Sequence, residues 1–217
     1  MMANQATAYG LRPIGLVGSG VNSTGVTEYE IASDNANAIF QYGIVVPTSA
    51  GVIARAADTA GGTTAALGVL MGVEYQDSVQ KKPVWLNYWP GAAGVSVDTN
   101  YPVKAYVADN PNQIFQVASD ASLTDRATAL ATVFSNASLG TSAQAGSTNN
   151  GNSTSALGVS TVATTATLPL RIVGIVDDEA NSDYTAAGIP LKVRINAHFN
   201  SNASRFDSET TSLTTGI

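Results

Sequence analysis

Short runs of apolar residues alternate along the chain with clusters of turn-forming residues, and this pattern predicts a mainly β protein. In residues 27–31 the carboxylates Glu28 and Glu30 alternate with Tyr29 and Ile31, as in a strand with one exposed side. Eight further runs have a strand-like composition: residues 39–47, 51–56, 67–75, 83–88, 103–107, 114–117, 168–176 and 191–199. Because no helical pattern separates these short runs, they favour an antiparallel β-sandwich or barrel over a parallel α/β sheet.

At most one short helix is expected, close to residue 127. Its apolar positions fall at helical spacing: Ala127, Leu130, Ala131 and Phe134. Thr124 precedes them as the expected N-cap. The same stretch begins a Ser/Thr/Ala/Gly-rich insertion of about residues 127–167 that carries no charged residue. We expect the insertion to be a long surface loop or, because disordered segments usually carry charge, to pack against other backbone or another subunit.

The two ends of the chain differ from the β-rich domain expected over residues 27–200. Residues 1–26 contain five glycines and few large apolar side chains, which is typical of an extended N-terminal arm. Residues 201–217 are polar, and we expect this tail to be ordered only by a neighbouring molecule.

Charge and composition exclude several classes of function. Charged residues make up 12% of the chain, compared with about 25% in ordinary globular proteins. The net charge is −6 and the ten Lys and Arg residues are scattered, so a nucleic-acid interface is not expected. No apolar run approaches the ~20 residues that span a bilayer, and no signal-peptide pattern begins the chain, so we expect synthesis in a cytoplasm and no membrane contact. The absence of cysteine excludes disulfides and thiolate chemistry.

The residues of catalytic type do not form a convincing pattern. Residues 20–27 have the glycine spacing of a phosphate-binding loop, but Val26 stands in place of the lysine and a strand pattern follows instead of a helix. His198 is the only histidine, so a histidine metal cluster cannot form and a Ser-His-Asp triad would depend on this one ring. We therefore expect neither a nucleotide site nor a triad.

The acidic residues are better explained as parts of turns than as a site. Residues 177–179 are all acidic but lack the spacing of a calcium-binding loop. Asp109 precedes an Asn-Pro turn, and nothing in the spacing connects it with Asp120 as a general acid and base. We expect no catalytic residue, no metal site and no cofactor, and therefore no enzyme.

Aromatic side chains concentrate at Trp85, Tyr88 and Trp89. Such groups can stack on sugars. On a continuous strand, however, Trp85 and Trp89 share one face and Tyr88 takes the other, so a core layer or a subunit interface accounts for them better. We treat the three residues as candidate interface aromatics.

Six blocks follow one another along the chain: residues 8–15 (Ala-Tyr-Gly-Leu-Arg-Pro-Ile-Gly), 24–31, 68–75, 106–111, 168–174 and 193–196. In this order they resemble the small structural proteins that tailed bacteriophages encode close to their major capsid protein, and the first block is similar to that group's F/Y-G-L-R-P-V/I start. The resemblance covers roughly residues 8–199, and its motifs are structural. It implies a capsid decoration, or cement, protein that binds the outside of the assembled shell, commonly as a trimer.

The implied partners are the major capsid protein and further copies of this chain in a homotrimer, and the implied location is the outer surface of the virion. We expect the trimer contacts to include part of residues 127–170. We expect the arm to contact a neighbouring subunit through five residues: Tyr9, Leu11, Arg12, Pro13 and Ile14. Two alternatives stay open. A carbohydrate-binding head fibre or adhesin needs an exposed tryptophan cluster, and the major capsid subunit is disfavoured because that fold needs a long spine helix and usually a longer chain.

Overall fold

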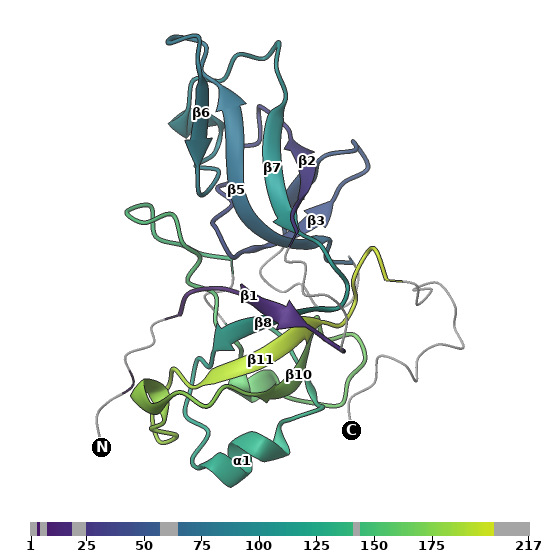
Figure 1. Cartoon of the computed structure of the whole chain (residues 1–217), viewed down its shortest axis with the longest axis vertical. Coiled ribbons are helices and arrows are strands. Elements are labelled where there is room, and N and C mark those ends of the chain that lie inside the picture. Colours follow the sequence, from purple (N-terminus) through teal and green to yellow (C-terminus); the bar gives the residue numbers. More distant parts are fainter. Residues whose placement is uncertain (1–3, 5–7, 19–24, 57–64, 141–143, 202–217) are drawn as a thin grey trace.

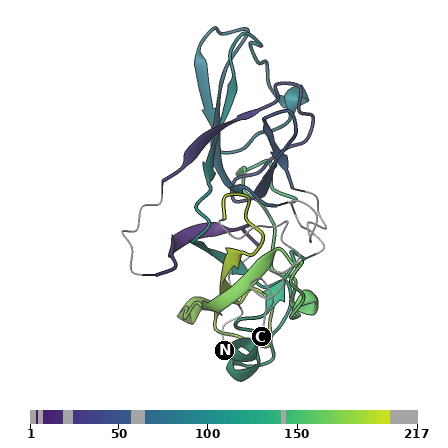
Figure 2. The ribbon, with the colours of Figure 1, turned by 90° about the vertical axis from the view of Figure 1, so that its right-hand side faces the viewer.

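The computed structural model describes residues 4, 8–18, 25–56, 65–140 and 144–201, and these residues form a mainly β protein. Their eleven strands lie in two sheets, stacked along the long axis of the molecule (Figures 1 and 2). The sheets pack together on a core to which both contribute, including Val69 from one and Phe115 from the other. The expectation of a β-sandwich or barrel with one short helix is confirmed.

The five-stranded sheet has the order β1-β8-β11-β10-β9, and all its neighbouring strands are antiparallel. Its strands are β1 (Arg12–Leu16), β8 (Gln113–Ala118), β9 (Asn136–Ala137), β10 (Leu170–Ile175) and β11 (Pro190–Ile195). Phe115 lies opposite Val193 in the β8–β11 pair, and Val117 lies opposite Leu191. All four side chains are buried, so the alternating apolar positions of these strands form one side of the shared core.

The six-stranded sheet has the order β3-β4-β2-β7-β5-β6. Its strands are β2 (Thr27–Ile31), β3 (Ile44–Pro47), β4 (Ile53–Arg55), β5 (Gly68–Gln76), β6 (Pro83–Leu86) and β7 (Val103–Ala108). Because β3 also pairs with β5, the strands β3, β4, β2, β7 and β5 close into a ring, and β6 extends from the other end of β5. The ring encloses a second apolar cluster that includes Leu70, Val73 and Ala105.

The N-terminal segment belongs to the protein's own sheet, which corrects part of the expected arm contact. Strand β1 pairs with β8, and Leu11 is fully buried in the shared core. Leu11 therefore cannot anchor the chain on a neighbour. Pro13 is half-buried, whereas Arg12 and Ile14 are exposed.

The helix α1 spans Arg126–Ala131, and its N-cap is Asp125 instead of the expected Thr124. The Asp125 carboxylate accepts a hydrogen bond from the backbone N–H of Thr128 at 2.7 Å, which satisfies one of the free donors of the first turn. The four apolar residues whose spacing predicts the helix are all exposed, and Ala129 is its buried residue. Short 3-10 helices occur at Ala92–Gly94, Val159–Thr161 and Glu179–Asn181.

The uncharged insertion packs largely against its own chain. Among its buried residues are Asn136, Leu139, Ser155 and Leu157. Single backbone bridges connect Asn152 with Gln41, beside the ring, and Leu157 with Ser119, beside the five-stranded sheet. The insertion therefore lies between both halves of the molecule, where backbone and small polar side chains hydrogen-bond to each other without charges.

Candidate functional site

The residues considered for catalysis have structural roles in the described chain. His198 is buried, and its Nδ1 accepts a hydrogen bond from the backbone N–H of Asn200 at 3.1 Å. Burial lowers the pKa of His198 to about 4, although the charge of Asp109 opposes this shift. The ring is therefore neutral at neutral pH and is held by its own turn.

The carboxylates considered as an acid–base pair or a cation site also serve the fold. Asp109 accepts hydrogen bonds from the hydroxyls of Thr27 and Tyr29, at 2.9 and 2.7 Å, and Asp120 accepts one from the N–H of Val159. Asp178 caps the 3-10 helix that begins at Glu179. No group of three or more His, Cys, Asp or Glu residues in the described part of the chain is arranged to hold a metal ion.

The glycine-rich loop considered for phosphate binding lies mainly outside the described residues. Its last residue, Thr27, begins strand β2 and no helix, so the residues that follow the loop do not provide the helix N-terminus of a phosphate site. No helix among the described residues is long and apolar enough to cross a membrane.

The three candidate interface aromatics separate in the structure, which corrects the expected shared face of Trp85 and Trp89. Strand β6 ends at Leu86, so the alternation of a continuous strand does not extend to Trp89. Trp89 is fully buried in the ring cluster, and its Nε1–H donates to the backbone oxygen of Asn35 at 3.0 Å. Tyr88 is half-buried and stacks on Phe40, whereas Trp85 is 62% exposed.

Trp85 belongs to a surface that sequence analysis did not assemble. We call it the aromatic face and define it as the outward side chains Trp85, Tyr106, Glu74, Lys104 and Glu28 on β6, β7, β5 and β2. The rings of Trp85 and Tyr106 stack with centroids 5.2 Å apart and an interplanar angle of 16°. These residues lie on two strands separated by β5, in which the residue opposite Tyr106 is Gly72. The register of β5 with both neighbours brings the two rings together across that strand.

Hydrogen bonds and ion pairs fix the polar groups of the aromatic face. The hydroxyl of Tyr106 donates to Oε2 of Glu74 at 2.9 Å, and Nζ of Lys104 lies 3.1 Å from Oε1 of Glu28. Burial, together with the Glu74 hydrogen bond and the nearby negative charge, raises the pKa of Tyr106 to about 12. The phenol therefore stays protonated and keeps donating to Glu74 at any physiological pH.

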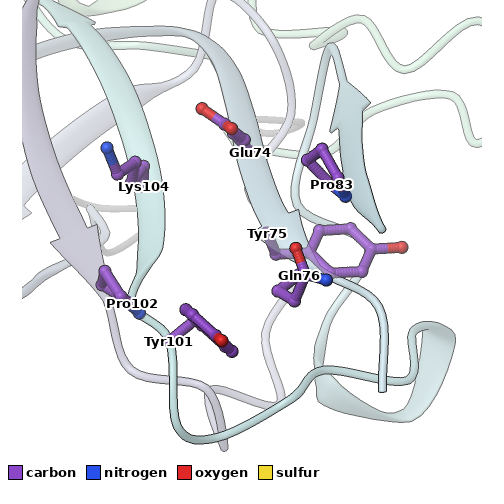
Figure 3. Close-up of a pocket in the computed structure, with 7 residues that line it drawn as sticks. All are labelled: Glu74, Tyr75, Gln76, Pro83, Tyr101, Pro102 and Lys104. Atoms are coloured by element: carbon purple, nitrogen blue, oxygen red, sulfur yellow. The ribbon is translucent and has the colours of Figure 1, made fainter. Parts of the chain in front are cut away.

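A small hollow adjoins the aromatic face at Glu74 and Lys104. Its volume is about 110 Å³, and it is also lined by Tyr75, Gln76, Pro83, Tyr101 and Pro102. In Figure 3 the side chains of Glu74 and Gln76 come from β5, Lys104 from β7 and Pro83 from the start of β6. Apolar rings and polar groups thus border the same concave surface.

A second surface lies at strand β1, where the predicted arm contacts are placed. The guanidinium of Arg12 lies over the ring of Tyr9 at 4.4 Å and near that of Tyr42 at 5.5 Å. Ile14 and Val17 are 42% and 44% exposed beside the open edge of the sheet.

Of the predicted arm residues, the structure thus exposes Arg12 and Ile14 on the edge strand β1 and leaves Tyr9 and Pro13 half-buried, and it separates Trp85 from Trp89. The partners of Trp85 on β5 and β7 have no signal in the local sequence, because they meet it only through strand pairing. Comparisons of the chain with protein-family models, curated protein sequences and solved structures found no match.

Proposed function

We propose that this protein is a capsid decoration protein, which binds the outer surface of a bacteriophage head and stabilises the shell. The six sequence blocks that carry the resemblance to such proteins fall on β1, β2, β5, β7, β10 and β11. These blocks therefore contain strands of both sheets. Their position supports the view that the resemblance concerns the architecture of the whole domain.

The observation that carries the proposal is the apolar surface around the five-stranded sheet. Ile14 and Val17 are exposed beside β1, at an edge where no further strand of the described chain pairs. Leu130 and Phe134, four residues apart near α1, are 54% and 56% exposed. Exposed apolar groups and an open strand edge are typical of surfaces that contact other proteins.

A decoration protein requires contact surfaces and no chemistry, and the described residues are consistent with that role. Buried polar residues such as Asn136, Ser153 and Ser155 take part in hydrogen bonds that hold the fold. The carboxylates considered for catalysis likewise cap turns or join strands. The role of the protein would then depend on its surfaces.

The proposal is tested on virions of the phage that encodes the chain. Mass spectrometry of purified heads should find the protein at many copies per particle, and electron cryomicroscopy should place it outside the shell. Purified protein added to heads that lack it should bind, and Ile14→Asp should weaken this binding.

The matched control is Val79→Asp, because Val79 is 77% exposed but lies between β5 and β6 of the six-stranded sheet. This variant should bind heads as the wild type does. Detection of the protein only inside the shell, only in the tail, or in no virion fraction would refute the proposal.

A further inference from the structure

We propose that the aromatic face, together with the adjoining hollow, binds a neutral saccharide, a property that goes beyond decoration of a shell. A pyranose ring has faces of C–H groups and a rim of hydroxyls. It therefore needs an apolar platform with hydrogen-bonding groups at its side. The aromatic face supplies both from four neighbouring strands.

The platform is the indole of Trp85. One of its faces lies against Tyr106, and the residue is still 62% exposed, so the exposed surface belongs to the face directed away from Tyr106. The stack with Tyr106 and the position of Trp85 within the paired strand β6 restrict the motion of the ring. A ligand that binds this preorganised indole loses little side-chain entropy on binding.

The polar groups lie beside this platform. Glu74 is the direct cross-strand neighbour of both Trp85 and Lys104. Its Oε2 accepts from Tyr106, while its Oε1 accepts no hydrogen bond from any described residue. A sugar hydroxyl can donate to Oε1, and Gln76 and Tyr101, which also line the hollow, carry further hydrogen-bonding groups.

The size of the hollow indicates how much of a ligand it holds. Its volume of about 110 Å³ is below the ~300 Å³ at which pockets for drug-sized ligands begin. It therefore fits one sugar unit or part of one, while the adjoining unit lies on Trp85. The expected ligand is an oligosaccharide segment that crosses from β7 to β6.

Charge selects the class of saccharide. Glu28, Glu30 and Glu74 lie on the outward side of β2 and β5, and Lys104 on β7 is paired with Glu28. The face is therefore net negative, as is the whole chain at −6. Uronic and sialic acids would be repelled, whereas neutral hexoses would not.

The test uses the full chain and an array of neutral and acidic oligosaccharides, followed by titration with the neutral ones that bind. The chain has two tryptophans, and Trp89 is fully buried, so acrylamide quenching of fluorescence reports mainly on Trp85. Neutral oligosaccharides should protect Trp85 from the quencher. Free oligosaccharide and immobilised polysaccharide are tested as separate arms.

Trp85→Ala should weaken binding at least about tenfold, which corresponds to about 1.4 kcal/mol, and Trp85→Phe should retain part of the affinity. Phe199→Ala is the control because Phe199 is 58% exposed and lies outside the aromatic face. Circular dichroism checks that each variant is folded. The proposal is overturned if no neutral saccharide protects Trp85, if Trp85→Ala binds like the wild type, or if binding is confined to acidic saccharides. Trp85→Ala should still bind heads, so a failure here is distinct from a failure of the decoration role.

Discussion

Gly146 lies directly against the ring of Phe40, which in turn stacks on Tyr88 with a centroid distance of 5.4 Å. A Cβ at residue 146 would overlap the aromatic ring of Phe40. Only glycine therefore allows the insertion to approach Phe40 so closely. Gly15 offers a contrast, because no atom lies within 4 Å of the position of its Cβ. Gly15 stands between Ile14 and Leu16, and Gly146 between Ala145 and Ser147, and neither local sequence indicates how closely another part of the chain approaches.

We expect Gly146→Ala to lower the free energy of unfolding by about 1–3 kcal/mol, since the added methyl group must displace an aromatic ring in a packed contact. Gly15→Ala should change it by less than about 0.5 kcal/mol. Urea denaturation followed by circular dichroism measures both values. Equal stability of the two variants would contradict the close contact between Gly146 and Phe40.

His198 makes stability depend on pH. Its pKa is about 4 in the folded chain, below the 6.5 of an unperturbed histidine, because burial disfavours the charged ring and Arg194 adds to this effect. Between these values the unfolded chain binds a proton that the folded chain does not. The buried neutral ring therefore makes its full contribution to the free energy of unfolding above pH 6.5, and this contribution is lost as the pH falls towards 4.

We expect the urea midpoint of the wild type to fall between pH 7 and pH 4.5, and to fall less in His198→Gln. The chain has one histidine, so the difference between the two proteins isolates this group from the carboxylates. Parallel pH profiles for wild type and variant would show that His198 does not titrate as the buried contact requires.

At the scale of elements, the local pattern predicts those strands whose residues alternate. Residues 27–31 coincide with β2, and the runs at 67–75 and 103–107 match β5 and β7 to within one residue at each end. Strands β1 and β9 were missed. Pro13 and Gly15 interrupt the alternation of β1, and β9 has two residues, so both strands depend on partners distant in sequence.

The same limit applies to the candidate site. Trp85 could be singled out from the sequence because aromatic residues concentrate around it. Tyr106 and Glu74 could not be joined to it, because their contact depends on the register of β5 with both β6 and β7. Register is set by the fold as a whole, and a single strand does not encode it.

The segment formed by Leu11 and strand β1 contains both a buried and an exposed side chain, and two substitutions separate their effects. Leu11→Ala should lower the free energy of unfolding by about 2–5 kcal/mol, because Leu11 is fully buried. Ile14→Ala should change stability by less than about 0.5 kcal/mol and weaken binding to heads, because Ile14 is 42% exposed. Chemical denaturation and head-binding assays measure the two effects.

Deletion of residues 2–16 should therefore do more than remove a contact. It removes β1 and leaves β8 as an unpaired edge, so the remaining chain should be less stable than the wild type. A deletion variant with unchanged stability would restore the simpler view of the segment as an arm.

At the scale of the whole molecule, the uncharged insertion is an internal connector. Its bridges reach Gln41 on one side and Ser119 on the other, so much of it is covered by its own chain. Its lack of charge therefore does not by itself require another subunit. Among its exposed residues are the large apolar side chains of Leu130 and Phe134.

We expect a homotrimer at micromolar concentration, in which Leu130 lies at the subunit contact. Stable association of this kind should bury at least about 1,000 Å² per interface. Leu130→Asp should shift the protein towards monomer in sedimentation velocity, because an unpaired carboxylate would be buried, whereas Val79→Asp should remain trimeric. A monomeric wild type, in solution and on heads, would refute the trimer.

The decoration role itself predicts a collective effect on the particle. Each copy that binds the assembled shell and not the dissociated subunits favours the assembled state, and copies that bridge two or more capsid subunits add to one another. Heads stripped of the protein should therefore burst at lower temperature or lower internal pressure than decorated heads. Adding purified protein should restore the higher threshold, and Ile14→Asp should restore it less at equal concentration. Equal bursting thresholds with and without bound protein would leave the chain as a surface component without a cementing role.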